Sequence, residues 1–215
     1  MTTDESVKKS PWLSIPASDY EAHMGPMGVD QDAVLNKFFK QVYSAVRPGR
    51  LAVFGCGTGN GFEHIERSIT ERVVGVDING RYLEIARRRY GYLAQTIEFK
   101  CTDVYACDFE SASFDMIHCP IIFEYVQIET LIEKIATCLA PQGTLSVVLQ
   151  LSGTEDGVVS DTGRNSVKAL EEAFRPVDPD KFVQLCLKAG FTKKDSRVIP
   201  LQHGKSFFTG VFEKA

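Results

Sequence analysis

Apolar runs and segments with a helical period alternate along the middle of this chain. The predicted strands are Leu51–Phe54, Arg72–Ile78, Thr96–Cys101, Phe114–Cys119 and Thr144–Leu151. The predicted helices span residues 30–46, 62–69, 81–90 and 128–139. Buried parallel strands are often apolar along their whole length, and strands that alternate with helices indicate a parallel sheet covered on both faces.

The C-terminal third follows another pattern. Ser152–Asn165 is polar and rich in glycine, and its length predicts a functional loop. After a predicted helix, Pro179–Ala189, come two strands, Thr192–Leu201 and Ser206–Phe212, separated by only four residues. So short a connection cannot cross over the sheet, so it must form a hairpin. We therefore predict an α/β fold: a Rossmann-like, doubly wound, mostly parallel sheet closed by a C-terminal antiparallel β-hairpin.

The chain before the first strand has a different character. Residues 1–18 are polar and contain two prolines. Asp30 is expected to cap the amphipathic helix that follows. We therefore divide the chain into an N-terminal lid or helical cap, residues 1–47, and the α/β region, residues 48–215. A chain of 215 residues is expected to fold both parts as a single structural domain.

Composition narrows the class of protein. The net charge of −4 argues against a protein that holds nucleic acid through phosphate contacts. The six cysteines form no CxxC pair and none lies near a histidine at a zinc-like spacing, so we expect free thiols and no metal. Neither a secretory signal nor an apolar stretch of about 18 residues is found, which predicts a cytoplasmic protein without a membrane partner. The sequence does not specify an oligomeric state.

The most specific motif, LAVFGCGTGNG, contains the first predicted strand. Gly55, Gly57 and Gly59 let the chain turn sharply and let a ligand approach the main chain. A glycine turn between a strand and a helix is typical of nucleotide pockets in doubly wound folds. The dinucleotide pattern GxGxxG is absent, because the sixth positions counted from Gly55 and Gly57 are Asn60 and Phe62. The loop indicates a nucleotide site, and a purely structural tight turn is the alternative.

Two acidic residues follow the next two strands. Asp77 ends the second strand 22 residues after Gly55, where a carboxylate can accept from both ribose hydroxyls. The alternative is a turn or cap residue before Asn79. Asp103, in CTDV, could accept from an adenine amino group while the Val104 N–H bonds the ring. Its alternative is a cap of the following segment.

These motifs stand in a fixed order. LAVFGCGTGNG is followed by VVGVDIN, FKCTDV, FDMIHCPIIFEYV and LAPQGTLSVVL. The ordered set resembles the motifs of class I S-adenosylmethionine-dependent methyltransferases of the small-molecule type, and the likeness covers about residues 50–151. That family also adds a terminal hairpin of this kind to a Rossmann-like sheet. The resemblance implies S-adenosyl-L-methionine as the cofactor.

The resemblance also implies which residues surround the cofactor. The glycine loop would lie against its methionine part, Ile78 and Val104 would sandwich the adenine, and Cys119 with Pro120 would flank the sulfonium. Together with Tyr20 of the N-terminal segment and the loop residues Cys56 and Asn60, the predicted cofactor-binding set is Tyr20, Gly55, Cys56, Gly57, Asn60, Asp77, Ile78, Asp103, Val104 and Cys119.

One position departs from the family pattern. An acidic residue usually stands two positions before the first glycine and helps to hold the amino group of the cofactor, but here the residue is Val53. Either backbone carbonyls around Gly55 and Cys119 replace it, or a residue of the N-terminal segment does.

The acceptor side offers few candidates. Glu124 and Tyr125 follow the fourth strand, where Glu124 is a base, a contact for a cationic acceptor, or a mere turn residue. Tyr20 and His23 belong to DYEAHM, which forms either a lid over the cofactor or a short helix packed on the core. The predicted catalytic residues are Glu124, Tyr125 and His23. His118 lies inside an apolar strand and is interpreted as a core histidine.

The sequence therefore predicts methyl transfer to a small-molecule acceptor. The motif [N/D]-P-P-[Y/F] of nucleic-acid amino methyltransferases is absent, because the corresponding residues are His118-Cys119-Pro120-Ile121. Two alternatives stay open. One is a methyltransferase that acts on protein or RNA, and the other is a non-catalytic adenine-nucleoside-binding or NAD-dependent Rossmann protein.

Overall fold

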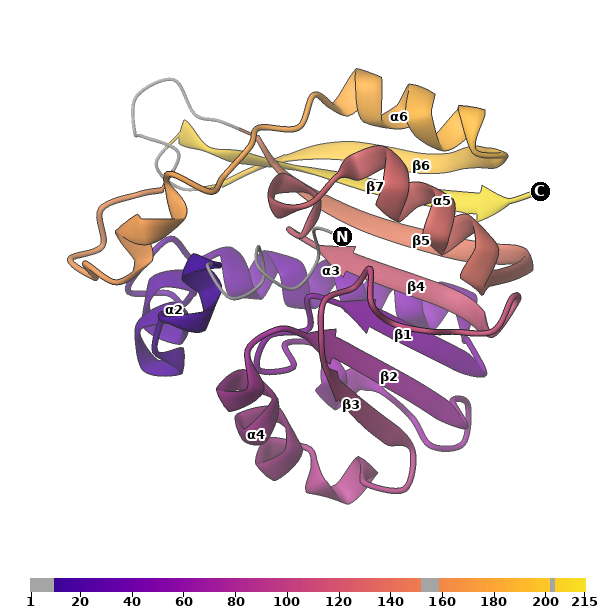
Figure 1. The fold of residues 1–215 in the computed structure, drawn as a ribbon, viewed down its shortest axis with the longest axis horizontal. Coiled ribbons are helices and arrows are strands. Elements are labelled where there is room, and N and C mark those ends of the chain that lie inside the picture. Colours follow the sequence, from indigo (N-terminus) through magenta and orange to yellow (C-terminus); the bar gives the residue numbers. More distant parts are fainter. Residues whose placement is uncertain (1–9, 152–158, 202–203) are drawn as a thin grey trace.

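A seven-stranded sheet with the order β3-β2-β1-β4-β5-β7-β6 forms the centre of the molecule (Figure 1). The computed structural model describes residues 10–151, 159–201 and 204–215. The strands are β1 Arg50–Phe54, β2 Arg72–Asp77, β3 Ile97–Cys101, β4 Phe114–Pro120, β5 Leu139–Leu151, β6 Phe191–Pro200 and β7 Ser206–Lys214. β1 to β5 pair in parallel, whereas β7 pairs antiparallel with both β5 and β6. The predicted fold class is confirmed.

Helices cover both faces of this sheet. The α-helices are α2 Ala17–Met24, α3 Gln31–Val46, α4 Gly80–Arg89, α5 Ile128–Cys138 and α6 Pro179–Lys188. Short 3₁₀ turns are η1 Pro11–Leu13, η2 Phe62–His64, η3 Gly91–Leu93, η4 Phe123–Tyr125 and η5 Val167–Leu170. Phe39 of α3 belongs to the apolar cluster on one face, and Phe182 of α6 to the cluster on the other. Alternate strand residues supply each cluster, so Val53 joins the first and Phe54 the second.

The predicted helix over residues 62–69 is wrong, because only the single turn η2 forms there. In a helix the Glu66 N–H would bond the carbonyl of Phe62. It donates instead to the hydroxyl of Tyr43 on α3, at 3.0 Å. A tertiary contact from α3 thus takes the donor that the helix would need.

Two helix boundaries also differ from the prediction. Asp30 precedes α3, but its backbone is left-handed (φ 52°) and its side chain makes no capping hydrogen bond. An effective N-cap has an extended backbone that directs its oxygen at the next turn, so the predicted cap is wrong. α5 ends at Cys138, and β5 begins at Leu139 rather than at Thr144.

The N-terminal segment divides into two parts. η1 and α2 lie beside η5 (Figure 1), whereas α3 shares the core with the sheet. The domain boundary at residue 47 therefore stays a prediction. The predicted loop 152–165 and the hairpin turn 202–205 lie partly outside the described residues. Within the described parts of the chain, no helix is long and apolar enough to cross a membrane.

Candidate active site

A cavity of about 1290 Å³ opens at the carboxyl ends of the central strands. Its walls include the loop after β1 and the residues that follow β2, β3 and β4. Residues of η1, α2 and the segment from 159 to 175 also line it. Ligands of open α/β sheets bind at this edge, so the cavity is the candidate active site.

The glycine loop gives the cavity its floor. Gly55, Gly57, Gly59 and Gly61 all have positive φ, at 72°, 53°, 90° and 93°. The N–H groups of Gly55 and Cys56 donate to the carbonyl of Val76 on β2, at 2.8 and 3.0 Å. These bonds fix the loop to the neighbouring strand and leave the Cβ-free main chain facing the cavity.

Asp77 connects this loop to the end of β2. Its Oδ2 accepts from the Gly57 N–H and its Oδ1 from the Asn79 N–H, both at 2.8 Å. Burial raises the pKa of this carboxyl to about 6, and the backbone N–H donors oppose the shift. Each carboxylate oxygen can accept a second hydrogen bond. The turn contacts and a ribose contact are therefore compatible.

Asp103, Val104 and Ile78 lie together at the ends of β2 and β3, where they line the cavity. Asp103 Oδ1 accepts from the Tyr105 N–H at 2.8 Å, which is the turn contact that the alternative interpretation expects. The remaining acceptor capacity of its carboxylate and the two apolar side chains suit an adenine ring.

The N-terminal segment forms a roof over the glycine loop. The Tyr20 ring stacks on Tyr82 of α4, with centroids 5.3 Å apart, and a Cβ on Gly57 would lie 3.6 Å from it. Asn79 Nδ2 donates to the carbonyl of Trp12 at 2.8 Å, which ties η1 to the turn after β2. Met24 of the same helix packs in the core, as the interpretation of DYEAHM as a short packed helix predicts, and the lid over the cofactor stays a prediction.

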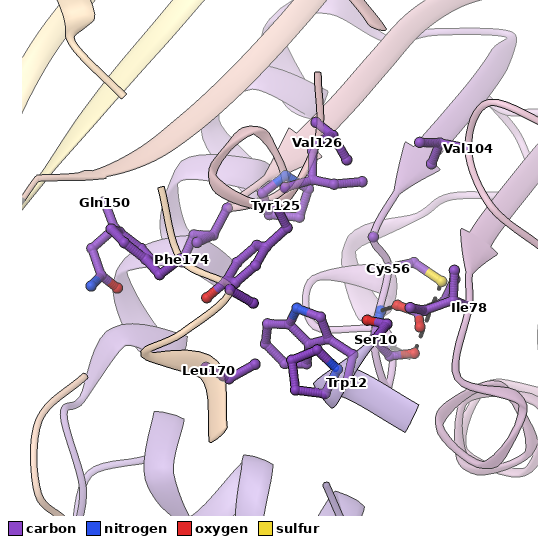
Figure 2. Close-up of a pocket in the computed structure, with 18 of the residues that line it drawn as sticks. Ser10, Trp12, Cys56, Ile78, Val104, Tyr125, Val126, Gln150, Leu170 and Phe174 are labelled. Carbon is purple, nitrogen blue, oxygen red and sulfur yellow. Dashed lines mark hydrogen bonds between the residues drawn. The ribbon is translucent and has the colours of Figure 1, made fainter. Parts of the chain in front are cut away.

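Aromatic rings line the middle of the cavity. Trp12 packs edge-on against Tyr125 with centroids 5.1 Å apart, and Tyr125 packs edge-on against Phe174 at 5.8 Å. Figure 2 shows Trp12 and Tyr125 between Ile78 on one side and Gln150 on the other. The cavity thus has one end beside Ile78, Asp103 and Val104, which we name the adenine end after the group predicted to bind there, and a second end on the other side of the rings.

His23 and Lys205 are buried at this second end. His23 Nδ1 lies 2.8 Å from Thr162 Oγ1. Burial, and then the positive charge of Lys205, lower the pKa of His23 to about 4, so the imidazole is neutral at pH 7. Lys205 is only 3% exposed and lines the cavity.

Two buried amides complete this second end. Gln31, which begins α3, donates from Nε2 to Oε1 of Gln150 at 3.3 Å, and both residues line the cavity. His118 lines it too, with Nδ1 3.0 Å from Ser146 Oγ and its ring 5.2 Å from that of Phe39. Burial lowers the pKa of His118 to about 3. His118 is thus a packed core histidine that also borders the cavity.

Glu124 lies behind this wall. It is fully buried and is not among the residues that line the cavity. Its Oε1 accepts from the Gln150 N–H at 2.6 Å, and its Oε2 has no hydrogen-bond partner among the described residues. Burial raises the pKa of Glu124 to about 8, so the carboxyl is mostly protonated at pH 7. The structure does not place it where a catalytic base would touch the acceptor.

Every member of the predicted cofactor set except Cys119 lines the cavity. The Cys119 side chain packs in the apolar core on the α5 and α6 face. Side chains alternate along a strand, so its neighbours His118 and Pro120 face the cavity instead. Val53 also lines the cavity, and so does Gln31 of α3. The acidic residue of α3 beside the glycine loop is Asp32, whose Oδ1 accepts from Asn60 Nδ2 at 3.3 Å. Trp12, Phe174 and Lys205 were not predicted, because their contacts join segments that are distant in sequence.

Comparison with known proteins agrees with this geometry. Residues 52–143 match the family model described as "Methyltransferase domain". No curated protein matches the chain. Three solved structures share the fold at low sequence identity. The [4+2]-cyclase SpnF is 17% identical, with a TM-score of 0.66 over 83% of this chain and 81% of that one.

The other two structures are named as methyltransferases. The N-methyltransferase NodS of Bradyrhizobium japonicum WM9 is 14% identical, with a TM-score of 0.68 over 98% of this chain and 97% of its own. Phosphoethanolamine N-methyltransferase 2 of Haemonchus contortus is 16% identical, with a TM-score of 0.69 over 100% of this chain and 60% of its own.

Residues 52–143 thus match a methyltransferase domain, the whole chain has the fold of the three structures, and the strand-end residues form a site that suits S-adenosylmethionine. The residues present fit that cofactor, because a Cβ-free loop, a carboxylate with spare acceptor capacity and two apolar side chains meet in one cavity. Across the described chain, no three His, Cys, Asp or Glu residues gather into a group that could hold a metal ion.

Proposed function

We propose that the protein is an S-adenosylmethionine-dependent methyltransferase that acts on a small molecule, which shares the cavity with the cofactor. The observation that carries the proposal is the size of the cavity. About 1290 Å³ exceeds the roughly 300–1,000 Å³ of a pocket for one ligand. Phosphoethanolamine N-methyltransferase 2 and geranyl diphosphate methyltransferase, which share the fold, are named for small acceptors.

The roof supports this choice over a macromolecular acceptor. Ser166 Oγ donates to Asp19 Oδ2 at 2.5 Å, and Ile15 packs with Val167 and Leu170. These contacts join the N-terminal segment to the segment after β5. A protein or RNA chain would have to separate the two segments to reach the space below, whereas a small molecule would not.

Each group of described residues would bind a different part of the cofactor. Asp77 would bind the ribose, Ile78 and Val104 the adenine, and the glycine loop the methionine part. When bound, S-adenosylmethionine supplies a methyl group that a positively charged sulfur has already activated. The protein then has to orient the acceptor, exclude water and take up any proton that the acceptor loses.

We propose that His23 accepts the proton that the acceptor loses. Its imidazole is neutral at pH 7, and a proton on Nδ1 donated to Thr162 Oγ1 leaves Nε2 as the acceptor atom. Tyr125 would serve as an aromatic wall. Glu124 would act as a positioning residue that holds the end of β5 through the Gln150 N–H.

Calorimetry with S-adenosylmethionine, S-adenosylhomocysteine and NAD tests the site, and we expect both sulfur nucleosides to bind. Binding of NAD but neither of them would overturn the assignment. A tritiated-methyl screen against fractionated cell metabolites tests the acceptor class. Label recovered only in macromolecules would overturn the small-molecule proposal. The six unpaired cysteines favour a reducing compartment, so we also propose that the protein is cytoplasmic.

A further inference from the structure

Four aromatic side chains from four separate segments meet in the cavity. They are Tyr20 of α2, Trp12 of η1, Tyr125 of η4 and Phe174, which follows η5, and we call them the aromatic array. Neighbouring rings meet at 77°, 81° and 84° in that order, with centroids 5.9, 5.1 and 5.8 Å apart. Figure 2 shows Tyr125 between Phe174 and Trp12. The array thus leads from the glycine loop, which the Tyr20 ring covers, toward the second end of the cavity.

Rings that meet edge-on form corners rather than a flat slot. A planar ligand can lie against only one ring of such a corner, whereas a compact rounded group contacts both rings at once. The face of each ring carries the negative part of the ring quadrupole and attracts a cation. A methylated onium centre, which is a nitrogen or sulfur that carries methyl groups and a positive charge, therefore suits the corner between Trp12 and Tyr125.

Carboxylates near the Tyr20 side of the array favour a cation further. Burial is the main cause that raises the pKa of the Tyr20 hydroxyl, and the charges of Asp32 and Asp77 raise it as well. The negative field of these two residues therefore reaches the first ring of the array. A positively charged ligand beside this ring would be attracted by the same field.

The cations of the protein that lie over aromatic rings do so elsewhere. In the described chain these pairs are Arg72 with Phe114, Arg87 with Phe99 and Lys100 with Phe109, and none of the six residues lines the cavity. Lys205 directly precedes β7, which β1, β4 and β5 separate from β2 in the sheet. Trp12 is tied to the turn after β2 by Asn79, so the array begins on the side of the cavity away from that lysine.

We propose that the aromatic array binds a methylated ammonium ion and that the acceptor of this protein is an amine. A neutral amine forms a nitrogen–carbon bond to the methyl group that S-adenosylmethionine supplies, and the electron pair of the broken bond stays on sulfur. The positive charge therefore passes to nitrogen, and the proton that the new ammonium loses goes to His23 Nε2. This inference rests on the proposed function, because it places the amine beside a bound cofactor in one cavity.

Ligand pairs that differ in charge but not in shape test the array. Trp12 is the only tryptophan, so its fluorescence reports binding at the array. The protein, saturated with S-adenosylhomocysteine, would be titrated with hydroxyalkyl trimethylammonium ions of increasing length, each paired with the alcohol in which carbon replaces the nitrogen. A second set carries a phenyl ring in place of the hydroxyl. We expect at least one ammonium ion to bind at least tenfold more tightly than its neutral partner.

Variants then assign this preference to the rings. Tyr125→Leu should reduce the preference for the ammonium ion to less than threefold, while Tyr125→Phe, which keeps a ring, should retain most of it. Tyr92→Leu is the matched control, because Tyr92 is 58% exposed and does not line the cavity. Thermal melting shows whether each variant is folded, and the wild-type comparison needs no variant. A preference that Tyr125→Leu leaves intact would place the cation away from the array and overturn the assignment.

The sulfonium of the cofactor is a second source of the same onium chemistry. Calorimetry with S-adenosylmethionine and S-adenosylhomocysteine, which differ by one methyl group and the positive charge on sulfur, separates the two sources. A preference for S-adenosylmethionine that depends on Tyr125, without preference for any ammonium ion, would assign the array to the cofactor and overturn the amine acceptor. If S-adenosylhomocysteine does not bind, the proposed function fails. If it binds and no ammonium ion is preferred over its neutral partner, only the amine acceptor is overturned.

Discussion

The two ends of the cavity are built in different ways. The adenine end consists of residues that directly follow β1, β2 and β3, and hydrogen bonds between neighbouring strand ends, such as that from the Gly57 N–H to the Asp77 carboxylate, hold it together. The second end, which we name the acceptor end because we propose that the acceptor binds there, consists of side chains from α2, α3, the segment after β5 and the start of β7. Its contacts join residues as far apart as His23 and Thr162.

This difference suggests that the two ends of the cavity have different roles in ligand binding. The adenine end depends on strand geometry, which the sheet enforces, so it is suited to one fixed ligand. The acceptor end depends on segments that meet only at their side chains, so its shape can change with few substitutions while the sheet is retained. The following variants test that difference, beginning with the largest expected effect.

Glu124 should make the acceptor end sensitive to pH. Its folded-state pKa of about 8 lies above the ordinary value of 4.5 for a glutamate, so between these pH values the unfolded chain loses a proton that the native protein keeps. This group therefore lowers stability as pH rises from 4.5 to 8, by up to about 5 kcal/mol. Glu124→Gln should remove that part of the pH dependence. The measurement is denaturant unfolding between pH 5 and 8.5.

The exposed Glu172→Gln is the matched control for this experiment and should keep the wild-type slope. Comparison of slopes is needed because Asp77 and Asp32 also have raised pKa values of about 6. An equal slope in wild type and Glu124→Gln would mean that the carboxyl is ionised and solvated, contrary to its buried position.

Gly59→Ala should damage the adenine end by about 3 kcal/mol of unfolding free energy. The residue has a φ of 90°, and a Cβ there would lie 2.6 Å from the ring of Tyr90. A left-handed backbone costs roughly 1–2 kcal/mol for a residue with a side chain, and overpacking costs a further 1–3 kcal/mol. Gly163→Ala is the matched control, since its φ is 74° and nothing lies within 4 Å of the added carbon. Equal losses in both variants would show that close packing beneath the loop is unimportant.

Asp77→Ala should weaken S-adenosylhomocysteine binding at least tenfold, or roughly 1.4 kcal/mol, through loss of charge-assisted hydrogen bonds. The loop also loses the acceptor for the Gly57 N–H, which adds to the effect. Isothermal calorimetry measures the affinity, and Asp77→Asn, which keeps an acceptor oxygen, should lie between. Unchanged affinity in Asp77→Ala would place the ribose elsewhere.

The same contrast explains which parts could be predicted from sequence. Strand patterns and the spacing from Gly55 to Asp77 are local properties, so the sheet and most of the adenine end were predicted. The prediction that Cys119 flanks the cofactor missed by one position. Side chains alternate along β4, so that of Cys119 points into the core. The error at residues 62–69 arose from a long-range donor–acceptor pair, Glu66 with Tyr43.

The acceptor end was predicted less well for the same reason. The positions of Trp12, Phe174 and Lys205 depend on which distant segments meet, and no local pattern in one sequence specifies that. The sequence correctly placed Glu124 after β4. It did not predict that Glu124 is buried behind Gln150, because that depends on how η4 packs against β5. The sequence therefore predicted which residues stand at the strand ends better than which side chains from distant segments meet in the cavity.

Tyr20 lies in the roof that covers both ends of the cavity. Its substitution should have the smallest effect on cofactor binding among these variants, and it tests whether the roof itself binds the cofactor. Its ring covers the glycine loop and stacks on Tyr82, and an aromatic pair contributes roughly 0.5–1.5 kcal/mol. Tyr20→Ala should weaken S-adenosylhomocysteine binding about threefold and speed its dissociation, measured by stopped-flow fluorescence of Trp12. Tyr20→Phe keeps the ring and should match the wild type. If Tyr20→Phe loses as much as Tyr20→Ala, the hydroxyl binds the cofactor directly, and the roof is part of the adenine end rather than a cover shared by both.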